Sequence, residues 1–548
     1  MPRGLELDEI IYGRFVKFLK RKRKRGVESL PHRVTLDEIN PRLTLLARAL
    51  TGKAISIFPA EREGGYKNNN FFLPTAFAEF ETIEQNVGFY LYRTLFLAVQ
   101  QELGFNHEVE VDDVSLSRVA AENTLQGEIT RSLKAMLEPK EVQDEIRAHF
   151  PQASIGRRNT GYAVDVLLDQ KPFSAVGENL NIAKLLAGSE GTLAFTTAIK
   201  FHVNKLPPKH EAVVCIHFES LHQCMDATVL AMKSAPFQCE LMDKIVLDAT
   251  KKNIEQSENR FFVEGDPAAL LCVELRSEDE ADLQAQIKTL ISNMKAAHFG
   301  FAFPVVYPPD TAKVWNLRAA GLGLLSNIPG DAKPVAFVED TAVALPDLPA
   351  YIREFDALMQ GFGQQAVYYA HAGAGELHLR PVLDLKTTEG RKQLRAIAEA
   401  SAHLVKKYNG SLSGEHGDGR VRAEFIPLML GEKNYQLLRE IKQLWDPENI
   451  FNPGKIVDAP PMDADLRYAE NQPDVRVKTF LDFSEDEGIL RAAEKCNGSG
   501  DCRKLPEMGA TMCPSYQATR NEKDTTRARA NALRNILTEK GAEKPFDS

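Results

Sequence analysis

Two histidines flank a short turn of small residues in the stretch YYAHAGAGELHLRP. His371 and His378 stand on either side of residues 372–375, with strand-forming residues before and after them. A tight hairpin would fold the two imidazoles toward each other, and two neutral imidazoles are good ligands for zinc or a similar divalent metal ion. The pattern predicts a metal site, and a pair of ordinary structural histidines remains the alternative.

A second cluster of reactive side chains lies in GSLSGEHGDGR, where Glu415 and His416 stand among small residues. Glycine lets a ligand come close to the backbone. A carboxylate beside an imidazole suits a site in which one group binds metal and the other moves a proton. A surface loop with a salt bridge is the alternative. Together with His371 and His378, this stretch supplies a His, His, Glu donor set and a spare base.

Two glycine-containing segments carry a weaker signal. In AGSEGTLAF, residues 188–192 form a predicted glycine turn whose backbone N–H groups could face a phosphate or a sugar. A plain turn between a helix and a strand explains the same composition. DPENIFNPGKI, residues 446–456, is typical of a turn that ends a helix.

The seven cysteines do not indicate a disulfide framework, because their number is odd and the chain is long. Cys215 and Cys272 stand in strand-like runs and are expected to be buried structural thiols. Cys496, Cys502 and Cys513 crowd together in a stretch that is poor in apolar residues. Crowded cysteines of this kind predict metal or redox chemistry in a reducing compartment.

The elements that must position these residues belong to a multidomain globular protein. At roughly 150 residues per domain, the 548 residues suggest about three or four domains. The hydrophobic content of 43% excludes wholesale disorder. No apolar run reaches the roughly 18 residues that span a bilayer, and the start MPRGLELDEI predicts no signal peptide. A net charge of −9 argues against general nucleic-acid binding.

The pattern of the chain changes along its length. Residues 1–108 are predicted to be mostly helical. Residues 109–205 are predicted to begin with a helical stretch and to end with a helix, a glycine turn and a strand. Residues 206–456 alternate strand and helix, which predicts an open sheet covered on one face. Residues 457–548 hold the cysteine cluster and a polar, basic helix.

The segments AGSEGTLAFTTAIKF, HAGAGELH, SGEHGDGR and WDPENIFNPGKI resemble, in this order, the FAD-linked oxidases of the vanillyl-alcohol oxidase and p-cresol methylhydroxylase type. The similarity is to the branch of D-lactate, glycolate and D-2-hydroxyglutarate dehydrogenases. It implies an α+β fold, with the second half of an FAD-binding domain in residues 109–205. Residues 206–456 would form a ferredoxin-like α+β substrate cap.

The resemblance also implies roles for the histidines. His371, His378 and Glu415 would hold a divalent metal ion that polarises the substrate hydroxyl and holds its carboxylate. His416 would act as the base that takes the hydroxyl proton while hydride passes to the flavin N5.

Further residues match the family's substrate and cofactor contacts. Arg318, in VWNLRAAG, would bind the carboxylate of an α-hydroxy acid, and an ordinary helix-surface arginine is the alternative. Lys333 would add a second positive charge. The residues expected to contact FAD are Gly188, Ser189, Glu190, Gly191, Thr192 and Asn452.

The cysteine-containing segment is similar to the iron–sulfur segment fused behind the flavin domains in large bacterial members of the family. Cys496, Cys502 and Cys513 would be ligands of a 4Fe–4S cluster in a small helical ferredoxin-like tail, residues 457–548. Such a cluster takes four thiolates, and the segment offers three. A zinc knuckle or free thiols are therefore the alternative.

The first half of the family's FAD-binding domain has no match in this sequence. That half carries a triple-glycine loop over the pyrophosphate, and the nearest segment, EREGGYKNNN, lacks the pattern. The FAD-binding domain is therefore expected to be partial. Residues 1–108 instead faintly resemble the helical N-terminal region of von Willebrand factor A-type proteins that accompany nitric oxide reductase, through RLTLLARALTGKAISIFP.

The predicted function is an FAD-dependent dehydrogenase that oxidises a D-2-hydroxy acid of the D-2-hydroxyglutarate or D-lactate type to the 2-oxo acid. Electrons would pass to the iron–sulfur centre and then to a quinone or carrier protein, and a second chain could supply the missing FAD half. The expected location is the cytoplasm or the periphery of the inner membrane. One alternative is an incomplete or fused remnant that acts as a non-catalytic binding or scaffold chain. Another is a hydroxy-acid binder that keeps the metal site but holds no flavin.

Overall fold

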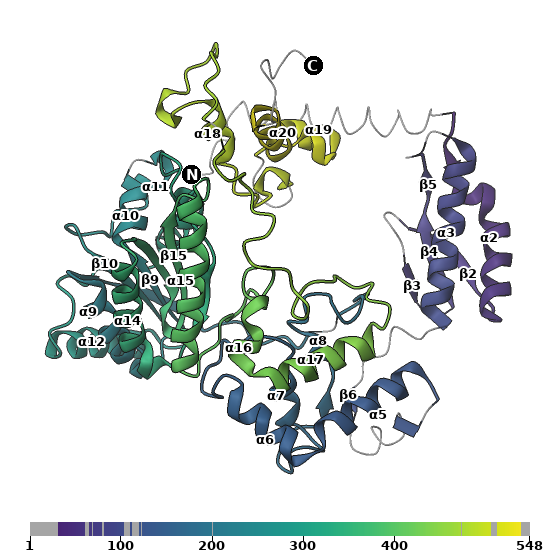
Figure 1. The fold of residues 1–548 in the computed structure, drawn as a ribbon, viewed down its shortest axis with the longest axis horizontal. Helices are drawn as coiled ribbons and strands as arrows, with labels where there is room; N and C mark the ends of the chain where they lie inside the picture. Colours follow the sequence, from purple (N-terminus) through teal and green to yellow (C-terminus); the bar gives the residue numbers. More distant parts are fainter. Residues whose placement is uncertain are drawn as a thin grey trace. The chain divides into compact units, whose positions relative to one another are not determined.

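The computed structural model describes residues 31–538, except 61–64, 68, 79, 81, 103–109, 112–119, 122, 200, 252, 473 and 506–511. The chain divides into two units by its internal contacts, and Figure 1 labels the helices and strands of both. One unit consists of Met1–Glu108, Thr197–Lys200 and Gly498–Ala532. The other consists of Val109–Thr196, Phe201–Asn497 and Leu533–Ser548.

In the described residues of 31–108, two long helices are joined by short strands that the sequence prediction did not include. Two helices, α2 (Leu36–Thr51) and α3 (Ile83–Glu102), pack on each other. One short strand precedes α2, and runs with aromatic and β-branched residues between the two helices form four more, because such residues pack well on a pleated surface. Of EREGGYKNNN, Gly64 lies outside the described residues and Gly65 begins a strand. The strands are β1 (Val34–Thr35), β2 (Ser56–Ala60), β3 (Gly65–Lys67), β4 (Asn70–Pro74) and β5 (Ala76–Phe77).

The region before the glycine turn is built from short helices that pack on a later part of the chain. Helices α5 and α6 contact α17 (Glu432–Trp445), and α6 also contacts α16 (Ile426–Leu430). Gly161 lies so close to Leu438 of α17 that an added Cβ would be 2.8 Å from its side chain. The elements are β6 (Glu110–Val111), α5 (Leu125–Leu137), α6 (Lys140–His149), α7 (Val164–Leu168), β7 (Leu180–Asn181) and α8 (Ala183–Leu186).

The strand predicted directly after the glycine turn is not found. Residues 194–199 and 201–208 adopt no regular secondary structure. Alternating apolar residues favour a strand only where a neighbouring strand supplies the hydrogen-bond ladder. The alternating apolar residues therefore did not suffice to form a strand. The side chains of Phe195, Ile199, Phe201 and Val203 are exposed.

An eight-stranded sheet forms the body of the second unit. Seven strands follow the order β11-β8-β10-β9-β14-β15-β12, β13 also pairs with β15, and every neighbouring pair is antiparallel. The strands are β8 (His210–Phe218), β9 (Gln238–Asp243), β10 (Ala269–Ser277), β11 (Val305–Val306), β12 (Lys333–Pro334), β13 (Val338–Ala342), β14 (Ala366–His371) and β15 (Glu376–Leu383).

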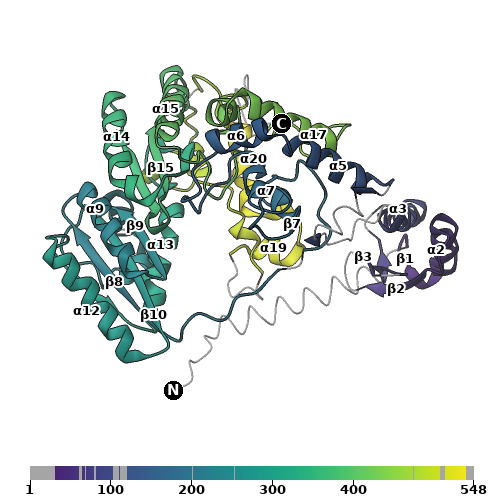
Figure 2. The ribbon, with the colours of Figure 1, turned by 90° about the horizontal axis from the view of Figure 1, so that it is seen from below.

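The sheet is covered on both faces, so the prediction of one covered face was wrong. Val214 and Ile216 of β8 belong to the large core on one face, and Val213 and Cys215 to a separate core on the other. Helices α9 and α12 pack on β8 and β10 (Figure 2), and α10 packs on β9 and β14. The helices are α9 (Leu221–Ala231), α10 (Lys244–Lys251), α11 (Ile254–Glu258), α12 (Glu280–Ala296), α13 (Thr311–Leu325), α14 (Leu348–Gly361) and α15 (Thr388–Lys407).

Two sequence expectations hold in this region. The predicted alternation of strand and helix is present, and Cys215 and Cys272 are fully buried free thiols opposite each other on β8 and β10. The cysteine-containing stretch forms short helices, and the predicted polar helix is α20. These helices are α18 (Ile489–Glu494), α19 (Pro514–Thr519) and α20 (Thr526–Thr538). None of the helices in the described part of the chain is both long and apolar enough to span a bilayer.

Candidate active site

The histidine hairpin forms as the sequence predicts. Strands β14 and β15 are joined by a single 3-10 turn over Ala372–Ala374 that ends at Gly375, which has φ +70°. A Cβ on Gly375 would lie 2.2 Å from the carbonyl oxygen of Val343, so only glycine fits this turn. His371 and His378 therefore stand on neighbouring strands, with ring centroids 5.1 Å apart.

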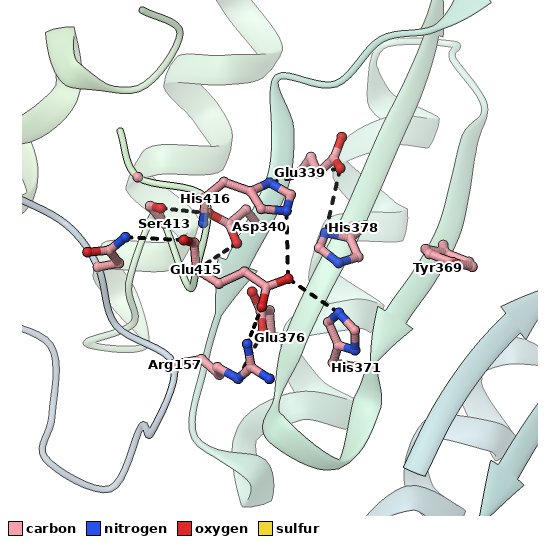
Figure 3. A network of polar contacts seen from close by, with 12 residues as sticks. Arg157, Glu339, Asp340, Tyr369, His371, Glu376, His378, Ser413, Glu415 and His416 are labelled. Atoms are coloured by element: carbon pink, nitrogen blue, oxygen red, sulfur yellow. Dashed lines mark hydrogen bonds and ion pairs between the residues drawn. The ribbon is translucent and has the colours of Figure 1, made fainter. Parts of the chain in front are cut away.

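A buried aspartate anchors the second predicted cluster against this hairpin. The pairing of β13 with β15 shifts register at Asp340, which has φ +84° and no exposed surface. Its carboxylate accepts hydrogen bonds from the Ser413 hydroxyl at 2.6 Å and from the backbone N–H groups of Glu415 at 2.9 Å and His416 at 3.0 Å (Figure 3). The loop of residues 413–416 is thereby held over the hairpin, and His416 stacks on His378 with centroids 5.2 Å apart.

Two donor sets with the geometry of a metal site share His378. The nearest ligand atoms of His371, His378 and Glu415 lie within 4.8 Å of one another, and so do those of Glu339, His378 and His416. In the first set, His371 Nε2 is 3.4 Å from Glu415 Oε1.

The arginines near the two carboxylates favour the first set. Arg380 lies 2.7 Å from Glu339, and both side chains are about 10% exposed (11% and 10%), so the pair is desolvated and Glu339 is already neutralised. Arg157 also contacts Glu415, but its side chain is 41% exposed, so water screens that pair. Glu415 is therefore the carboxylate that is better able to exchange its arginine for a metal ion.

His378 is in the protonation state that a metal ligand needs. It is buried, and its Nδ1 has no hydrogen-bond partner in the described part of the chain. Burial, reinforced by the neighbouring His371 and His416, lowers the pKa of His378 to about 3. The ring is therefore neutral near pH 7. Two imidazoles, one of them held neutral, and one carboxylate fit zinc or a similar ion.

Arg318 lies beside this cluster. It projects from α13, its guanidinium carbon lies 4.0 Å from the centre of the Tyr369 ring, and one of its nitrogens is 3.4 Å from His371 Nδ1. The same nitrogen donates to Glu240 at 2.6 Å. The structure therefore brings together Arg318 and the predicted metal ligands.

Lys333 is not brought to the cluster. It pairs with Leu383 at the far end of β15, five residues beyond His378, or roughly 17 Å along the strand. Its ammonium donates to the carbonyl of Ile328, and burial lowers its pKa.

The predicted FAD-contacting turn is bound to the loop that carries Glu415. Glu190, with φ +54°, accepts hydrogen bonds from the backbone N–H groups of Asp418 at 2.7 Å and Gly419 at 3.1 Å. Asn452 donates to the carbonyl of Glu190 at 2.7 Å, so these two predicted residues meet. The turn is closed by contacts of the other predicted residues: Ser189 accepts from Thr192 at 2.7 Å, Thr192 accepts from Lys442 at 2.7 Å, and Gly188 and Gly191 have φ of +79° and +69°.

Glu376 is a functional candidate that the sequence reasoning missed, as are Glu240, Asp340 and Arg157. Glu376 lies fully buried at the start of β15, 3.5 Å from Arg157. Burial raises its pKa to about 9, and the nearby carboxylates of Asp340 and Glu415 act in the same direction. It is therefore protonated at neutral pH. For Glu240, the sequence offered one signal of a functional role, a carboxylate within the otherwise largely apolar strand segment CELMD.

The three predicted cluster cysteines are divided between the two units. Cys502 and Cys513 are buried in the first unit, and Cys496 is half-buried in the second. Burial opposes ionisation of Cys513, but the backbone N–H of Tyr516 and the Thr526 hydroxyl outweigh it, so its pKa is lowered. Ligation of a cluster by these thiols stays a prediction.

Comparison with known proteins agrees with the resemblance of the central region. Residues 207–456 match the model of the FAD linked oxidases, C-terminal domain. A D-2-hydroxyglutarate dehydrogenase from Pseudomonas putida is 31% identical over 450 residues, which are 79% of this chain and 42% of that protein. A D-lactate dehydrogenase from Archaeoglobus fulgidus is 30% identical over 283 residues, 50% of this chain and 58% of that protein.

Among solved structures, a 4-ethylphenol oxidase from Gulosibacter chungangensis matches with a TM-score of 0.34 and 16% identity, over 46% of this chain and 55% of that chain. The chain spans 42% and 58% of the length of the two curated relatives. The comparisons support the FAD-linked oxidase family for the central region. The iron–sulfur fusion and the von Willebrand factor A-type resemblance stay predictions.

Proposed function

We propose that this chain carries the substrate half of an FAD-dependent dehydrogenase that oxidises D-2-hydroxy acids of the D-2-hydroxyglutarate or D-lactate type. The observation that carries the proposal is the convergence of His371, His378 and Glu415 within 4.8 Å, with Arg318 beside them. A cation site next to a guanidinium matches a substrate that bears a hydroxyl and a carboxylate on adjacent carbons.

Each side chain has a distinct task in this reaction. His371, His378 and Glu415 would hold a divalent ion, which supplies Lewis-acid polarisation of the hydroxyl when it is bound. FAD supplies the hydride acceptor, and Glu190 and Asn452 would lie beside it. Arg318 binds the substrate carboxylate.

His416 takes the hydroxyl proton. Its side chain is 41% exposed, so a substrate can reach it, and its Nε2 lies 3.7 Å from Glu415 Oε1. Stacking on the buried His378 fixes the plane of its ring, which orients the base toward the donor set.

A second chain would supply the missing FAD half. Phe195, Ile199, Phe201 and Val203 are 66%, 66%, 75% and 89% exposed. Within the second unit, Phe201 and Val203 stand two residues apart, which would put them on one face of an extended segment. An apolar face of this kind marks an interaction site. It also favours the second candidate function, a chain that is inactive until a partner completes it.

Electrons would leave through an iron–sulfur centre on Cys496, Cys502 and Cys513 toward a quinone or carrier protein. The lowered pKa of Cys513 supports this proposal, because the thiolate is the form that binds iron. Iron and acid-labile sulfide, measured after anaerobic reconstitution, should fall in Cys513→Ser and stay unchanged in Cys224→Ser, which alters a buried thiol elsewhere.

The absorption spectrum of the purified chain, with and without added FAD, tests the function. Flavin bands that a D-2-hydroxy acid bleaches in the wild type, and not in His416→Gln, would support the dehydrogenase. Absence of bound flavin even with excess FAD would contradict catalysis by this chain alone and favour the partner-dependent alternative.

A further inference from the structure

Among the described residues, Glu240 is the one carboxylate that contacts both the candidate metal site, at His371, and the proposed substrate-binding arginine, Arg318. We infer that Glu240 is a positioning residue that couples metal binding by His371 to carboxylate binding by Arg318. The inference rests on the proposed function, because it assigns these two partners the roles given there.

The sheet places Glu240 opposite His371. Strands β9 and β14 pair antiparallel with Ala370 opposite Leu241 and Tyr369 opposite Met242, and the next pair in this register is His371 and Glu240. One carboxylate oxygen of Glu240 lies 3.0 Å from His371 Nδ1, and the other lies 2.6 Å from Arg318 Nη2. Each oxygen therefore serves a different partner.

The contact with His371 selects the form of the ring that can bind metal. A carboxylate next to Nδ1 holds the proton on that nitrogen, which leaves the lone pair on Nε2. Nε2 is the atom that lies 3.4 Å from Glu415, on the side of the donor set. Without Glu240, the proton could sit on either nitrogen and the ring could turn.

The contact with Arg318 fixes the guanidinium that receives the substrate. Arg318 is packed against the Tyr369 ring, and Glu240 holds the edge of the guanidinium that lies nearest His371. Glu240 is 8% exposed, so water could hardly take over its hydrogen bonds to His371 and Arg318 if the carboxylate were removed. One side chain thereby sets the distance between the metal ligand and the carboxylate binder.

A simple structural ion pair is the competing explanation, and the neighbouring strand offers a matched control. Glu274 on β10 is buried and contacts Arg276, but it touches none of the proposed metal ligands among the described residues. Glu240→Gln and Glu274→Gln each remove one buried carboxylate charge beside an arginine. Only Glu240→Gln should alter the site.

The test is a calorimetric titration of the metal-stripped full chain with zinc chloride. Glu240→Gln should bind zinc about 10- to 100-fold more weakly than the wild type, the range measured when a group that orients a metal ligand is lost. Glu274→Gln should bind within about twofold of the wild type, even if its unfolding midpoint falls. D-2-hydroxyglutarate should also bind more weakly to zinc-loaded Glu240→Gln than to the wild type.

A second readout covers poor folding of the glutamine variant. Glu240→Asp keeps the charge on a shorter side chain and should recover part of the zinc affinity, and nitrogen NMR of His371 should show the Nδ1–H form in the wild type. Equal zinc affinity in the wild type and Glu240→Gln would overturn the coupling while leaving the metal site intact. No zinc binding by the wild type would overturn the metal site itself, and the coupling with it.

Discussion

Replacing Asp340 by asparagine should damage the candidate site without straining the backbone. Asparagine tolerates the positive φ of +84° at this position, so the main chain has no reason to move. The change removes one negative charge and replaces one carboxylate oxygen by an NH₂ group. Three donors converge on this carboxylate, from Ser413, Glu415 and His416.

The size of the loss follows from these contacts. One carboxylate oxygen accepts from the Ser413 hydroxyl and the His416 N–H, and the other accepts from the Glu415 N–H. If the amide oxygen keeps the first pair, the NH₂ group faces the Glu415 N–H, donor against donor. A hydrogen bond to a charged group contributes about 1.5–3 kcal/mol, and the retained bonds also weaken. The expected loss of unfolding free energy is roughly 2–4 kcal/mol.

Two measurements on the same preparations test this reasoning. Urea unfolding gives the free-energy loss, and a zinc titration should show affinity reduced by about 10- to 100-fold, because the backbone of Glu415 loses its anchor. Ser413→Ala is the control, since it removes one donor and leaves the Asp340 charge in place, and it should cost only about 1 kcal/mol. If Asp340→Asn matched Ser413→Ala in both measurements, the charge of Asp340 would not organise the loop.

Three further changes have defined outcomes. Gly188→Ala would put a Cβ 2.1 Å from Asn159 Oδ1 and should lower the unfolding free energy by about 2–4 kcal/mol in urea, against about 1 kcal/mol for Gly191→Ala, where nothing lies within 4 Å; similar losses would show that the turn is not packed as described. Burial raises the pKa of Asp243 from 3.8 to about 6, so the folded state retains a proton that the unfolded state releases, and stability falls as pH rises through that window. Asp243→Asn should therefore gain up to about 3 kcal/mol on the wild type between pH 4 and pH 7 in urea unfolding, and a constant difference would refute the shifted pKa. Arg318→Lys should weaken D-2-hydroxyglutarate binding to the zinc-loaded chain by about 10- to 100-fold in calorimetry, because lysine lacks the paired donors of a guanidinium; unchanged affinity would remove Arg318 from the substrate site.

The parts of the site that could be predicted are those with a local signal. His371 and His378 are joined by a tight turn of small residues, so their proximity follows from the eight residues HAGAGELH. Glu415 and His416 stood out because reactive side chains are unusual among so many glycines. The alternation of strands and helices was readable because each element carries its own periodicity.

The parts that could not be predicted depend on pairing between distant segments. Glu240 meets His371 only because β9 and β14 are neighbours, a relation that strand order alone decides. Asp340 can anchor the loop of residues 413–416 because the pairing of β13 shifts register at this residue. A shift of one residue reverses the direction of every side chain that follows, and the sequence does not show where it occurs. The second covered face of the sheet was missed although the nearly continuous apolar runs of β8 and β10 are typical of strands buried on both faces.

The hydrogen bonds from Asp418 and Gly419 to Glu190 join the loop that carries Glu415 and His416 to the turn at residues 188–192. If the loop holds the proposed ion and the turn receives the proposed FAD-binding half, the two binding equilibria are linked through these hydrogen bonds. Any change that ion binding made to the affinity of the turn would be matched by an equal change that occupation of the turn made to the affinity for the ion. The zinc affinity of the chain would then depend on whether that partner is bound, by the same factor as the partner's affinity depends on zinc.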